Sequence, residues 1–412
     1  MTDIYGYDNK KLNIIMFNMS AFYDWEHGIV NRNYYVLNEL AKSDKVNKII
    51  AVDFLPLRLK KTIKHYFQNI LGQARKHEMI FGDLTSVCYQ KSEKIWVYST
   101  IDSFFSPKKV ARELKKIQSR LNLHNVVYWS YNPFFTQFID ILEKDFFVFD
   151  AVDNWSAHPS YLKLMSREKI LNNYKKIAGK ADLIFTVAEE LLGFYENFGR
   201  TKDVHWIPNG VDFEHYNNET LLARKNVLSE IKQPVIGYMG TIQERIDLDL
   251  LVKIANANPD KVLALCGPVW PSIAAEVKEK LATLTNVILP GRIAFDDAPG
   301  WISRFDVGII PHKIDEFIKS TNPMKMYEYL ACGKPVVSTP GAGIEMFKDE
   351  IYIANDEREF LEKIDLAFKE DSPEKRANRK KMVGAHSYEN RVKQMLELLI
   401  EKIKPTRDAG SA

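Results

Sequence analysis

The sequence predicts an α/β protein with two doubly wound domains, and three observations lead to this fold class. Short apolar runs alternate with amphipathic segments along the chain, which is typical of parallel strands joined by crossover helices. The length of 412 residues exceeds one ordinary domain of roughly 150 residues. A fresh series of strands also begins after a polar, charged stretch over residues 217–233. We therefore expect an N-terminal domain over residues 1–216 and a C-terminal domain over residues 217–387.

Buried strands are expected where short apolar runs stand between turn residues. In the first domain these runs are Leu12–Phe17, Lys48–Phe54, Ile95–Tyr98, Val126–Ser130, Phe146–Asp150, Leu183–Val187 and Val204–Ile207. In the second domain they are Val235–Met239, Val262–Cys266, Val287–Leu289, Asp306–Ile310 and Pro335–Ser338. Helices are expected at Asn31–Ser43 and Lys108–Leu121, and a long amphipathic helix over residues 388–403 is a candidate to pack back on the first domain.

The composition excludes some classes of protein. Hydrophobic residues at 46% and charged residues at 27% are typical of a globular protein with an ample core, and a net charge of +3 gives little attraction to nucleic acid. Cys88, Cys266 and Cys332 are widely spaced and form no metal-binding pattern, so we expect reduced thiols and no bound metal. The first residues lack the pattern of a signal peptide, and no run of about 18 apolar residues occurs. These features favour a cytoplasmic protein that does not span a membrane.

Two positions in the second domain follow predicted strands. Gly240 and Thr241 come directly after the strand Val235–Met239, where a glycine lets backbone N–H groups approach a phosphate. A tight strand-to-helix turn needs the same glycine for structural reasons. His312 follows a strand that Pro311 stops, and it is either a residue at the edge of a binding cleft or a solvated loop residue.

The segment from residue 320 to residue 338 carries more information. Pro323 suits the first turn of a helix and Gly333 suits its end. Lys325 and Glu328 then share one helical face near the positive end of the helix dipole. A diphosphate would meet the ammonium there, and the carboxylate would accept hydrogen bonds from ribose hydroxyls. The alternative is a surface ion pair worth only about 0.3–0.5 kcal/mol.

This segment resembles the nucleotide-sugar motif of the GT-B glycosyltransferases. The similarity lies in Pro-Met-Lys-Met-Tyr-Glu-Tyr-Leu-Ala-Cys-Gly-Lys-Pro-Val-Val over residues 323–337. Further pieces that resemble the family follow its order: residues 181–187, residues 207–212 before the second domain, residues 238–242, and residues 289–292.

The resemblance implies two Rossmann-like domains that face a central cleft, with a nucleotide sugar as co-substrate and no resident cofactor. It further implies that the C-terminal domain binds the donor, with Lys325 at the diphosphate, Glu328 at the ribose and Arg292 in the turn that faces the base. Many retaining members carry a second glutamate eight residues before the first, and this sequence has Ser320 there. We therefore expect an inverting reaction.

The first domain offers candidates for the acceptor side. Asp150 and Asp153 follow the strand Phe146–Asp150, and an ionised aspartate can remove the proton from an acceptor hydroxyl. The alternative is that either aspartate only caps a helix. His158 and His27 are reserve bases, and Gly28 would permit close approach of a ligand.

The loop around Asp153 resembles that of xanthan-type glucuronosyltransferases and of teichuronic-acid glycosyltransferases. In the xanthan-type enzymes the aspartate that matches Asp153 is the general base, and their Met-Lys pair matches Met324 and Lys325. The resemblance thus makes Asp153 the expected catalytic residue.

The stretch from Arg58 to Arg120 is locally basic and contains apolar residues. Its basic residues include Lys60, Lys61, Lys64, Arg75, Lys76, Lys108, Lys109, Arg112, Lys115 and Lys116, and the interleaved apolar residues are Phe67, Ile70, Leu71, Phe104 and Phe105. Such a stretch is either a solvated face or a peripheral contact with anionic membrane.

The leading hypothesis is a transferase that moves a hexose or hexuronic acid from a UDP-sugar to a surface glycan or a lipid-linked oligosaccharide at the inner face of the plasma membrane. One alternative is a GT-B-fold nucleotide-sugar epimerase, which needs no acceptor. The other is a catalytically silent nucleotide-sugar-binding subunit that stabilises a partner transferase.

Overall fold

A computed structural model describes residues 11–53, 62–64, 66–72, 76–102, 106–341 and 343–403. Within these residues the chain divides into two compact units. The N-terminal unit holds the chain up to Thr186, then Leu191–Ile207 and the chain from Val392 onward. The C-terminal unit holds Val187–Glu190 and Pro208–Arg391. The main boundary, between Ile207 and Pro208, thus lies nine residues before the expected one after residue 216.

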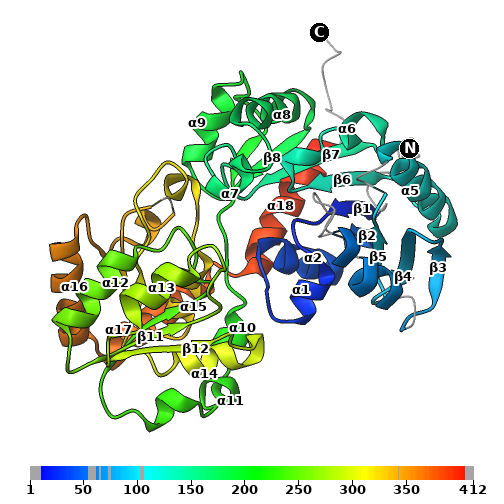
Figure 1. Cartoon of the computed structure of the whole chain (residues 1–412). Coiled ribbons are helices and arrows are strands. Elements are labelled where there is room, and N and C mark those ends of the chain that lie inside the picture. The colour runs from blue at the N-terminus through cyan, green and yellow to red at the C-terminus, as the bar shows by residue number, and fades with distance from the viewer. Residues whose placement is uncertain are drawn as a thin grey trace. The chain divides into compact units, whose positions relative to one another are not determined.

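The N-terminal unit contains a nine-stranded sheet in the order β3-β4-β5-β2-β1-β6-β7-β8-β9. Neighbouring strands from β5 to β9 pair in parallel, and β3 and β4 add an antiparallel edge. Helices lie on both faces of this sheet (Figure 1). The strands are β1 (Leu12–Phe17), β2 (Val46–Val52), β3 (Met79–Gly82), β4 (Ser86–Gln90), β5 (Ile95–Thr100), β6 (Val126–Ser130), β7 (Phe146–Ala151), β8 (Leu183–Thr186) and β9 (Val204–Trp206).

Helices of this unit begin at side chains suited to that position. Asn31, Ser106 and Ser166 each accept a hydrogen bond from a backbone N–H of the first turn that follows. The helices are α1 (Phe22–Glu26), α2 (Arg32–Lys42), the π-helix η1 (Tyr66–Leu71), α5 (Pro107–Leu121), η2 (Pro133–Phe135), α6 (Phe138–Ile141), α7 (Pro159–Leu162), α8 (Arg167–Lys180) and α9 (Glu190–Glu196). The last helix, α18 (Tyr388–Ile403), belongs to this unit from Val392, and Lys402 pairs with Asp203 at 2.9 Å.

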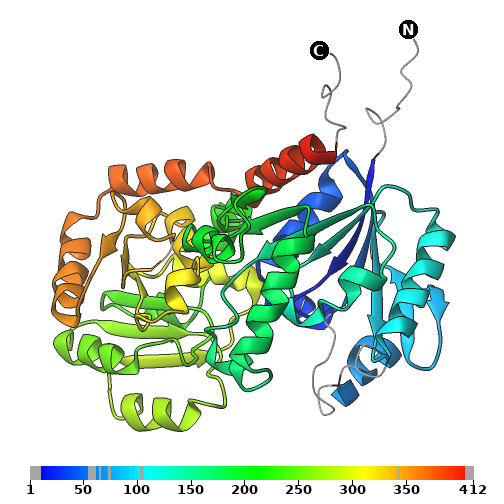
Figure 2. The same ribbon diagram turned by 90° about the horizontal axis from the view of Figure 1, so that it is seen from above.

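The C-terminal unit contains a six-stranded parallel sheet in the order β12-β11-β10-β13-β14-β15. Numbered within the unit, this order is 3-2-1-4-5-6, that of a doubly wound Rossmann sheet. Figure 2 shows its strands seen from above. The strands are β10 (Val235–Met239), β11 (Val262–Cys266), β12 (Val287–Gly291), β13 (Val307–Ile310), β14 (Val336–Ser338) and β15 (Tyr352–Ile353).

Two hydrophobic cores cover the two faces of this sheet. Along β10, Val235 and Met239 belong to one core and Ile236 and Tyr238 to the other, because side chains alternate across a strand. The helices that supply the cores and the loops between them are α10 (Phe213–Tyr216), α11 (Glu219–Leu222), η3 (Val227–Glu230), α12 (Leu248–Ala257), α13 (Ala274–Leu281), η4 (Phe295–Asp297), α14 (Ala298–Ile302), η5 (Ile318–Ser320), α15 (Met324–Ala331), η6 (Glu345–Phe347), α16 (Glu357–Glu370) and α17 (Pro373–Gly384).

The predicted strands are present within a few residues of their expected ends, but three elements were not predicted. The β3–β4 edge and the two-residue β15 are short, and β4 contains only a brief apolar run. The three cysteines are buried free thiols. Among the described residues no helix is both long and apolar enough to cross a membrane.

Candidate functional site

The strand order of the C-terminal unit defines where a ligand can bind. In a doubly wound sheet the crevice lies beyond the carboxyl ends of the two strands where the order reverses, which are β10 and β13. Gly240 follows β10 and His312 lies two residues beyond β13. The backbone of Ile246 forms an antiparallel bridge with that of His312, so the loop after β10 is held against the end of β13.

Close backbone packing shapes the start of this loop. Gly240 has φ 137° and Gly267 has φ 153°, in the region that favours glycine. A Cβ on Gly267 would lie 2.1 Å from the carbonyl oxygen of Gly240, and the N–H of Gly240 donates to the carbonyl of Cys266 at 2.9 Å. Two glycines at the ends of neighbouring strands thus allow the loop to turn tightly.

Lys325 lies on the first turn of α15 and is 7% exposed. A Cβ on Gly240 would lie 3.7 Å from Lys325 Nζ, and Nζ is 5.1 Å from the centre of the Tyr238 ring. Among the described residues no carboxylate lies within 4.0 Å of this ammonium. The alternative of a surface ion pair with Glu328 is therefore wrong. A buried cation beside the loop after β10 is suited to an anionic ligand.

The electrostatics of this region couple three side chains. Burial lowers the pKa of Lys325, the charge of Arg245 lowers it further, and Glu328 opposes the change. Burial raises the pKa of Glu328, while Lys325 and a hydrogen bond from Tyr216 act in the opposite direction. A strongly perturbed cation and carboxylate close together at a strand edge are a feature of functional sites.

His312 is 2% exposed, so its interpretation as a solvated loop residue is wrong. Its Nε2 has no hydrogen-bond partner among the described residues, and burial together with Lys325 and Arg245 lowers its pKa well below the usual value. Its carbonyl oxygen accepts a hydrogen bond from Thr339 at 2.9 Å. The imidazole is thus a neutral group beside two cations.

Other expected donor residues lie on the same edge of the sheet. Thr241 follows Gly240, and its carbonyl oxygen accepts a hydrogen bond from the Tyr238 hydroxyl at 3.0 Å. Arg292 is exposed and directly follows β12, where Gly291 has φ 81°. Met324 is the first residue of α15. Arg245 was missed by sequence reasoning, although its place in the loop after the first strand of a Rossmann sheet is a signal that identifies such a cation.

In the N-terminal unit, Asp150 forms a buried ion pair. Arg32 Nε donates to both carboxylate oxygens, at 3.0 and 3.1 Å, and the side chains are 3% and 0% exposed. Burial raises the pKa of Asp150 and the guanidinium opposes this rise. The pair joins the first residue of α2 to the end of β7. Asp150 therefore has a structural partner that the sequence did not reveal.

Asp153 lies three residues further on and is partly exposed. Its backbone carbonyl accepts the hydroxyl of Tyr174 at 3.1 Å, and its negative charge contributes to raising the pKa of Tyr161, after the larger effect of burial. Tyr161 stacks on the buried Trp155 with ring centres 4.0 Å apart. The carboxylate thus lies beside a rigid aromatic cluster, and Asp153 is not the first residue before a helix.

The two reserve histidines have local contacts. His158 caps α7, with Nδ1 accepting from the N–H of Ser160 at 3.1 Å. His27 is exposed, stacks on Tyr23 with ring centres 4.0 Å apart, and its Nδ1 lies 2.7 Å from the Tyr23 carbonyl oxygen. Gly28 has φ 78° and follows His27 at the end of α1, where glycine is favoured for its turn.

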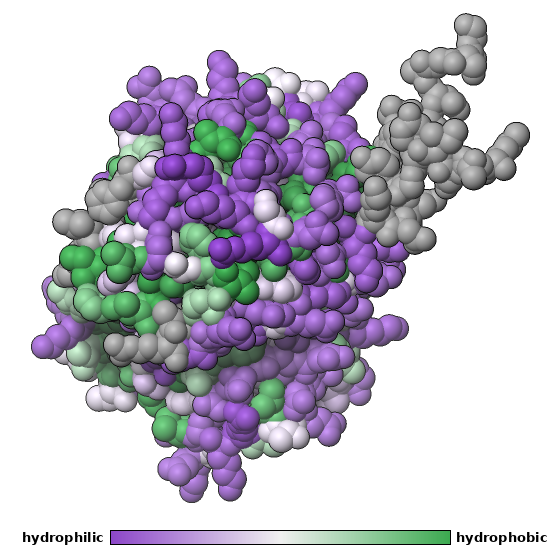
Figure 3. Space-filling model, turned by 90° about the vertical axis from the view of Figure 1, so that its right-hand side faces the viewer, coloured by the Kyte–Doolittle hydropathy of each residue, from purple (hydrophilic) through white to green (hydrophobic). Residues whose placement is uncertain are grey.

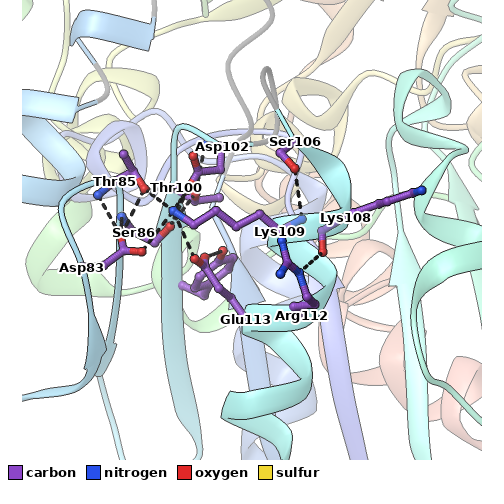
Figure 4. Close-up of polar contacts among 11 residues, drawn as sticks. Asp83, Thr85, Ser86, Thr100, Asp102, Ser106, Lys108, Lys109, Arg112 and Glu113 are labelled. Atoms are coloured by element: carbon purple, nitrogen blue, oxygen red, sulfur yellow. Dashed lines mark hydrogen bonds and ion pairs between the residues drawn. The ribbon is translucent and has the colours of Figure 1, made fainter.

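Three acidic side chains of the N-terminal unit surround the ammonium of a partly exposed lysine. Asp83, Asp102 and Glu113 are close enough to hold a metal ion, but Lys109 Nζ lies among them at 3.0, 2.6 and 3.4 Å (Figure 4). Thr85 accepts a further hydrogen bond from this ammonium at 2.7 Å. Although burial opposes it, the bonds to Asp102 and Asp83 raise the pKa of Lys109. The ammonium thus supplies the positive charge for this cluster.

Ion pairs engage two of the lysines in the basic stretch from Arg58 to Arg120. Lys109 is paired with Asp102, and Lys115 forms an exposed ion pair with Glu143. Exposed members remain at Lys64, Lys76, Lys108, Arg112 and Lys116. Lys60, Lys61, Arg75, Phe104 and Phe105 lie outside the described residues.

Comparison with known proteins finds sequence similarity to glycosyltransferases in the unit that contains the site at the carboxyl ends of β10 and β13. A family model described as "Glycosyl transferase-like" matches residues 245–397. TuaH of Bacillus subtilis, whose description as a teichuronic acid biosynthesis glycosyltransferase is itself provisional, is 28% identical over 218 residues. That alignment spans 51% of this chain and 54% of the relative, so the match covers about half the length of each protein.

Solved structures match nearly the whole chain. HepE of Anabaena in complex with UDP-glucose has a TM-score of 0.66 and 15% identity, and the match covers 94% of this chain and 99% of that one. Sucrose-phosphate synthase of Thermosynechococcus elongatus has a TM-score of 0.70 and 14% identity, with coverage of 95% and 99%. The chain has the GT-B fold. In sequence, residues 245–397 resemble the glycosyl transferase-like family, and the fold of the whole chain resembles that of these solved structures.

Proposed function

We propose that the chain transfers a sugar from a UDP-sugar to a glycan acceptor. The observation that carries this proposal is the buried ammonium of Lys325, which lies beside Gly240 at the reversal point of the C-terminal sheet with no carboxylate within 4.0 Å among the described residues. Structures of HepE with UDP and with UDP-glucose support this choice of donor, because that protein shares the fold.

In the proposed donor site, Lys325 and Arg245 bind the diphosphate. The diphosphate gains negative charge as the bond to the sugar breaks, so a preformed cation stabilises the transition state more than the ground state. Glu328 accepts hydrogen bonds from the ribose hydroxyls, and Arg292 faces the base. The backbone after Gly240 approaches the phosphates. His312 stays neutral and is available as a hydrogen-bond partner for the sugar.

On the acceptor side, Asp153 removes the proton from the attacking hydroxyl and the reaction inverts the anomeric configuration. Its partial exposure, the loop resemblance, and Ser320 in place of a second glutamate support this role. The Ser320 hydroxyl donates to the Phe317 carbonyl at 2.7 Å. Asp153→Asn keeps the shape and removes the base, so turnover should fall about 10²–10⁴-fold while UDP affinity stays at the wild-type value. Proton NMR of the product checks the stereochemistry, and a retained configuration rejects this mechanism.

The acceptor is a surface glycan or a lipid-linked oligosaccharide, and the N-terminal unit binds the anionic membrane that carries it. Ile63 is 54% exposed and Phe67 is 62% exposed, and the exposed Lys64 lies between them in the sequence. Figure 3 shows apolar side chains gathered on one face among hydrophilic ones. Phe67→Ser should reduce sedimentation with anionic vesicles, whereas the change of Leu366, 39% exposed on α16, to Ser should not. Equal sedimentation with neutral and anionic vesicles would reject the electrostatic part.

The decisive experiment uses the purified full chain. Thermal shift with a panel of nucleotide sugars identifies the donor, since a ligand at about 100 times its Kd adds roughly 2.7 kcal/mol of stability. Transfer or slow hydrolysis of that donor, unchanged by EDTA, supports a metal-independent glycosyltransferase. Interconversion of free nucleotide sugars would identify an epimerase. Donor binding without any turnover would favour a silent subunit.

A further inference from the structure

The chain passes between its two units next to residues 208–211 and 386–391, and these two segments are joined inside the C-terminal unit. Val211 and Ser387 form a parallel bridge. The N–H of Val211 donates to the carbonyl of His386, and the N–H of Tyr388 donates to the carbonyl of Val211, both at 3.1 Å. We call residues 208–211 and 386–391 the crossing segments. Their mutual hydrogen bonds mean that one cannot shift far without the other.

One side chain ties these crossing segments to the proposed donor site. The N–H of Asn209 donates to Asn322 Oδ1 at 3.0 Å, and Asn209 Nδ2 donates to the backbone carbonyl of Asn322 at 2.6 Å. The carbonyl of Asn209 also accepts from Arg391 Nε at 3.4 Å. Asn209 thus contacts both the second crossing segment and Asn322.

Asn322 is equally well connected to the helix that follows it. It lies two residues before α15, and its Oδ1 also accepts the hydroxyl of Tyr327 at 2.9 Å. The side chain is buried, with 5% of the residue exposed. A Cβ on Gly343 would lie 1.7 Å from Asn322 Nδ2, so the amide is enclosed from that side as well. A single amide oxygen therefore receives one bond from a crossing segment and one from α15.

We propose that Asn322 is a positioning residue that couples occupancy of the nucleotide site to the position of the crossing segments. This inference rests on the proposed function, since Lys325 stands three residues after Asn322. When a diphosphate draws Lys325 and the first turn of α15 toward it, the two bonds at Oδ1 transmit the displacement to Asn209. Such a relay between a binding element and a hinge is a coupling free energy, so its loss changes donor affinity by no more than that coupling and is expected mainly in turnover.

The test compares Asn322→Ala with wild type by three measurements. UDP affinity from calorimetry should change less than about threefold, whereas kcat for transfer should fall about tenfold or more. Hydrogen exchange should show that UDP slows exchange in residues 209–211 and 386–391 of the wild-type protein and not of the variant. Tyr327→Phe removes only one of the two bonds and should give an intermediate kcat. Asn378→Ala is the matched control, because Asn378 is exposed on α17 outside the crossing segments, its side chain donates to Glu350 at 2.7 Å, and the variant should behave as wild type.

The outcomes separate this inference from the proposed function. Failure of the wild-type protein to bind any nucleoside diphosphate rejects both. Wild-type binding and turnover with unchanged kcat in Asn322→Ala and Tyr327→Phe rejects the coupling alone. A proportional loss of UDP affinity and kcat also rejects it, because Asn322 would then only shape the donor site. If Asn322→Ala does not fold, the kcat and exchange of Tyr327→Phe decide the question.

Discussion

The ammonium of Lys325 gives the sharpest test of the donor site, through the substitution Lys325→Met. Methionine has a similar length and no charge, so it keeps the packing against Tyr238. A charge-assisted hydrogen bond contributes about 1.5–3 kcal/mol, which corresponds to a loss of UDP affinity of about 10- to 150-fold. The ligand-free protein should not lose stability, because the charge is buried without a carboxylate within 4.0 Å among the described residues.

The assay is isothermal titration with UDP, together with thermal unfolding of the ligand-free protein. Lys334→Met is the control, since Lys334 is a partly buried lysine of the same unit and its Nζ donates to the carbonyl of Ser303 at 2.7 Å. That variant should lose stability and keep its UDP affinity. Wild-type UDP affinity in Lys325→Met would remove Lys325 from the site and would refute the reasoning from burial and charge.

Three further predictions follow from named contacts. Burial lowers the pKa of Lys325 and a bound diphosphate raises it again, so UDP affinity should fall as pH rises through the lowered pKa, and binding at about pH 8.5 should take up a proton. Titrations in two buffers of different ionisation enthalpy measure this uptake. Gly267→Ala should weaken UDP binding at least tenfold, because its Cβ would lie 2.1 Å from the Gly240 oxygen. Asp150→Asn should cost about 3–5 kcal/mol in urea unfolding, since it removes the carboxylate that lies 3.0 Å from the buried guanidinium of Arg32.

Matched controls make these predictions specific. Gly193→Ala is the control for Gly267, because no atom lies within 4 Å of its added Cβ, and it should leave UDP binding unchanged. Asp140→Asn is the control for Asp150, since its ion pair with Lys176 is half exposed and should cost at most about 1 kcal/mol. The absence of proton uptake when wild type binds UDP would contradict the argument from the Lys325 pKa. Equal UDP affinities of the two glycine variants, or equal stabilities of the two aspartate variants, would contradict the arguments from backbone packing and from the buried ion pair.

Sequence periodicity predicted the central strands well because they are continuous apolar runs. All six residues of β1 and all five of β10 are buried, and Asn13 is the one polar side chain that interrupts the apolar run of β1. The edge elements were harder. β4 and β15 derive their position from neighbouring strands rather than from their own composition, and a two-residue strand has no detectable period.

The candidate site was predicted only in part, and the misses share a cause. Lys325 and Glu328 stand in one motif, so their spacing could be recognised. Arg245 and Asn322 act through contacts made by folding, and no sequence pattern shows that Asn322 meets Asn209 across 113 positions. Partners at such separations become visible only in three dimensions.

Two of the buried charges, Asp150 and Lys325, show why burial alone does not identify a functional residue. Asp150 is fully buried, but Arg32 lies against both of its oxygens and the pair is electrically complete within the chain. Lys325 is also buried, but its burial and the charge of Arg245 lower its pKa while Glu328 opposes this, and among the described residues no carboxylate lies within 4.0 Å of its ammonium. Folding alone gives no reason to retain such a charge, because a neutral side chain would avoid the cost of desolvation. An anionic ligand supplies the missing partner, so the unbalanced lysine, rather than the balanced aspartate, marks the place where the co-substrate binds.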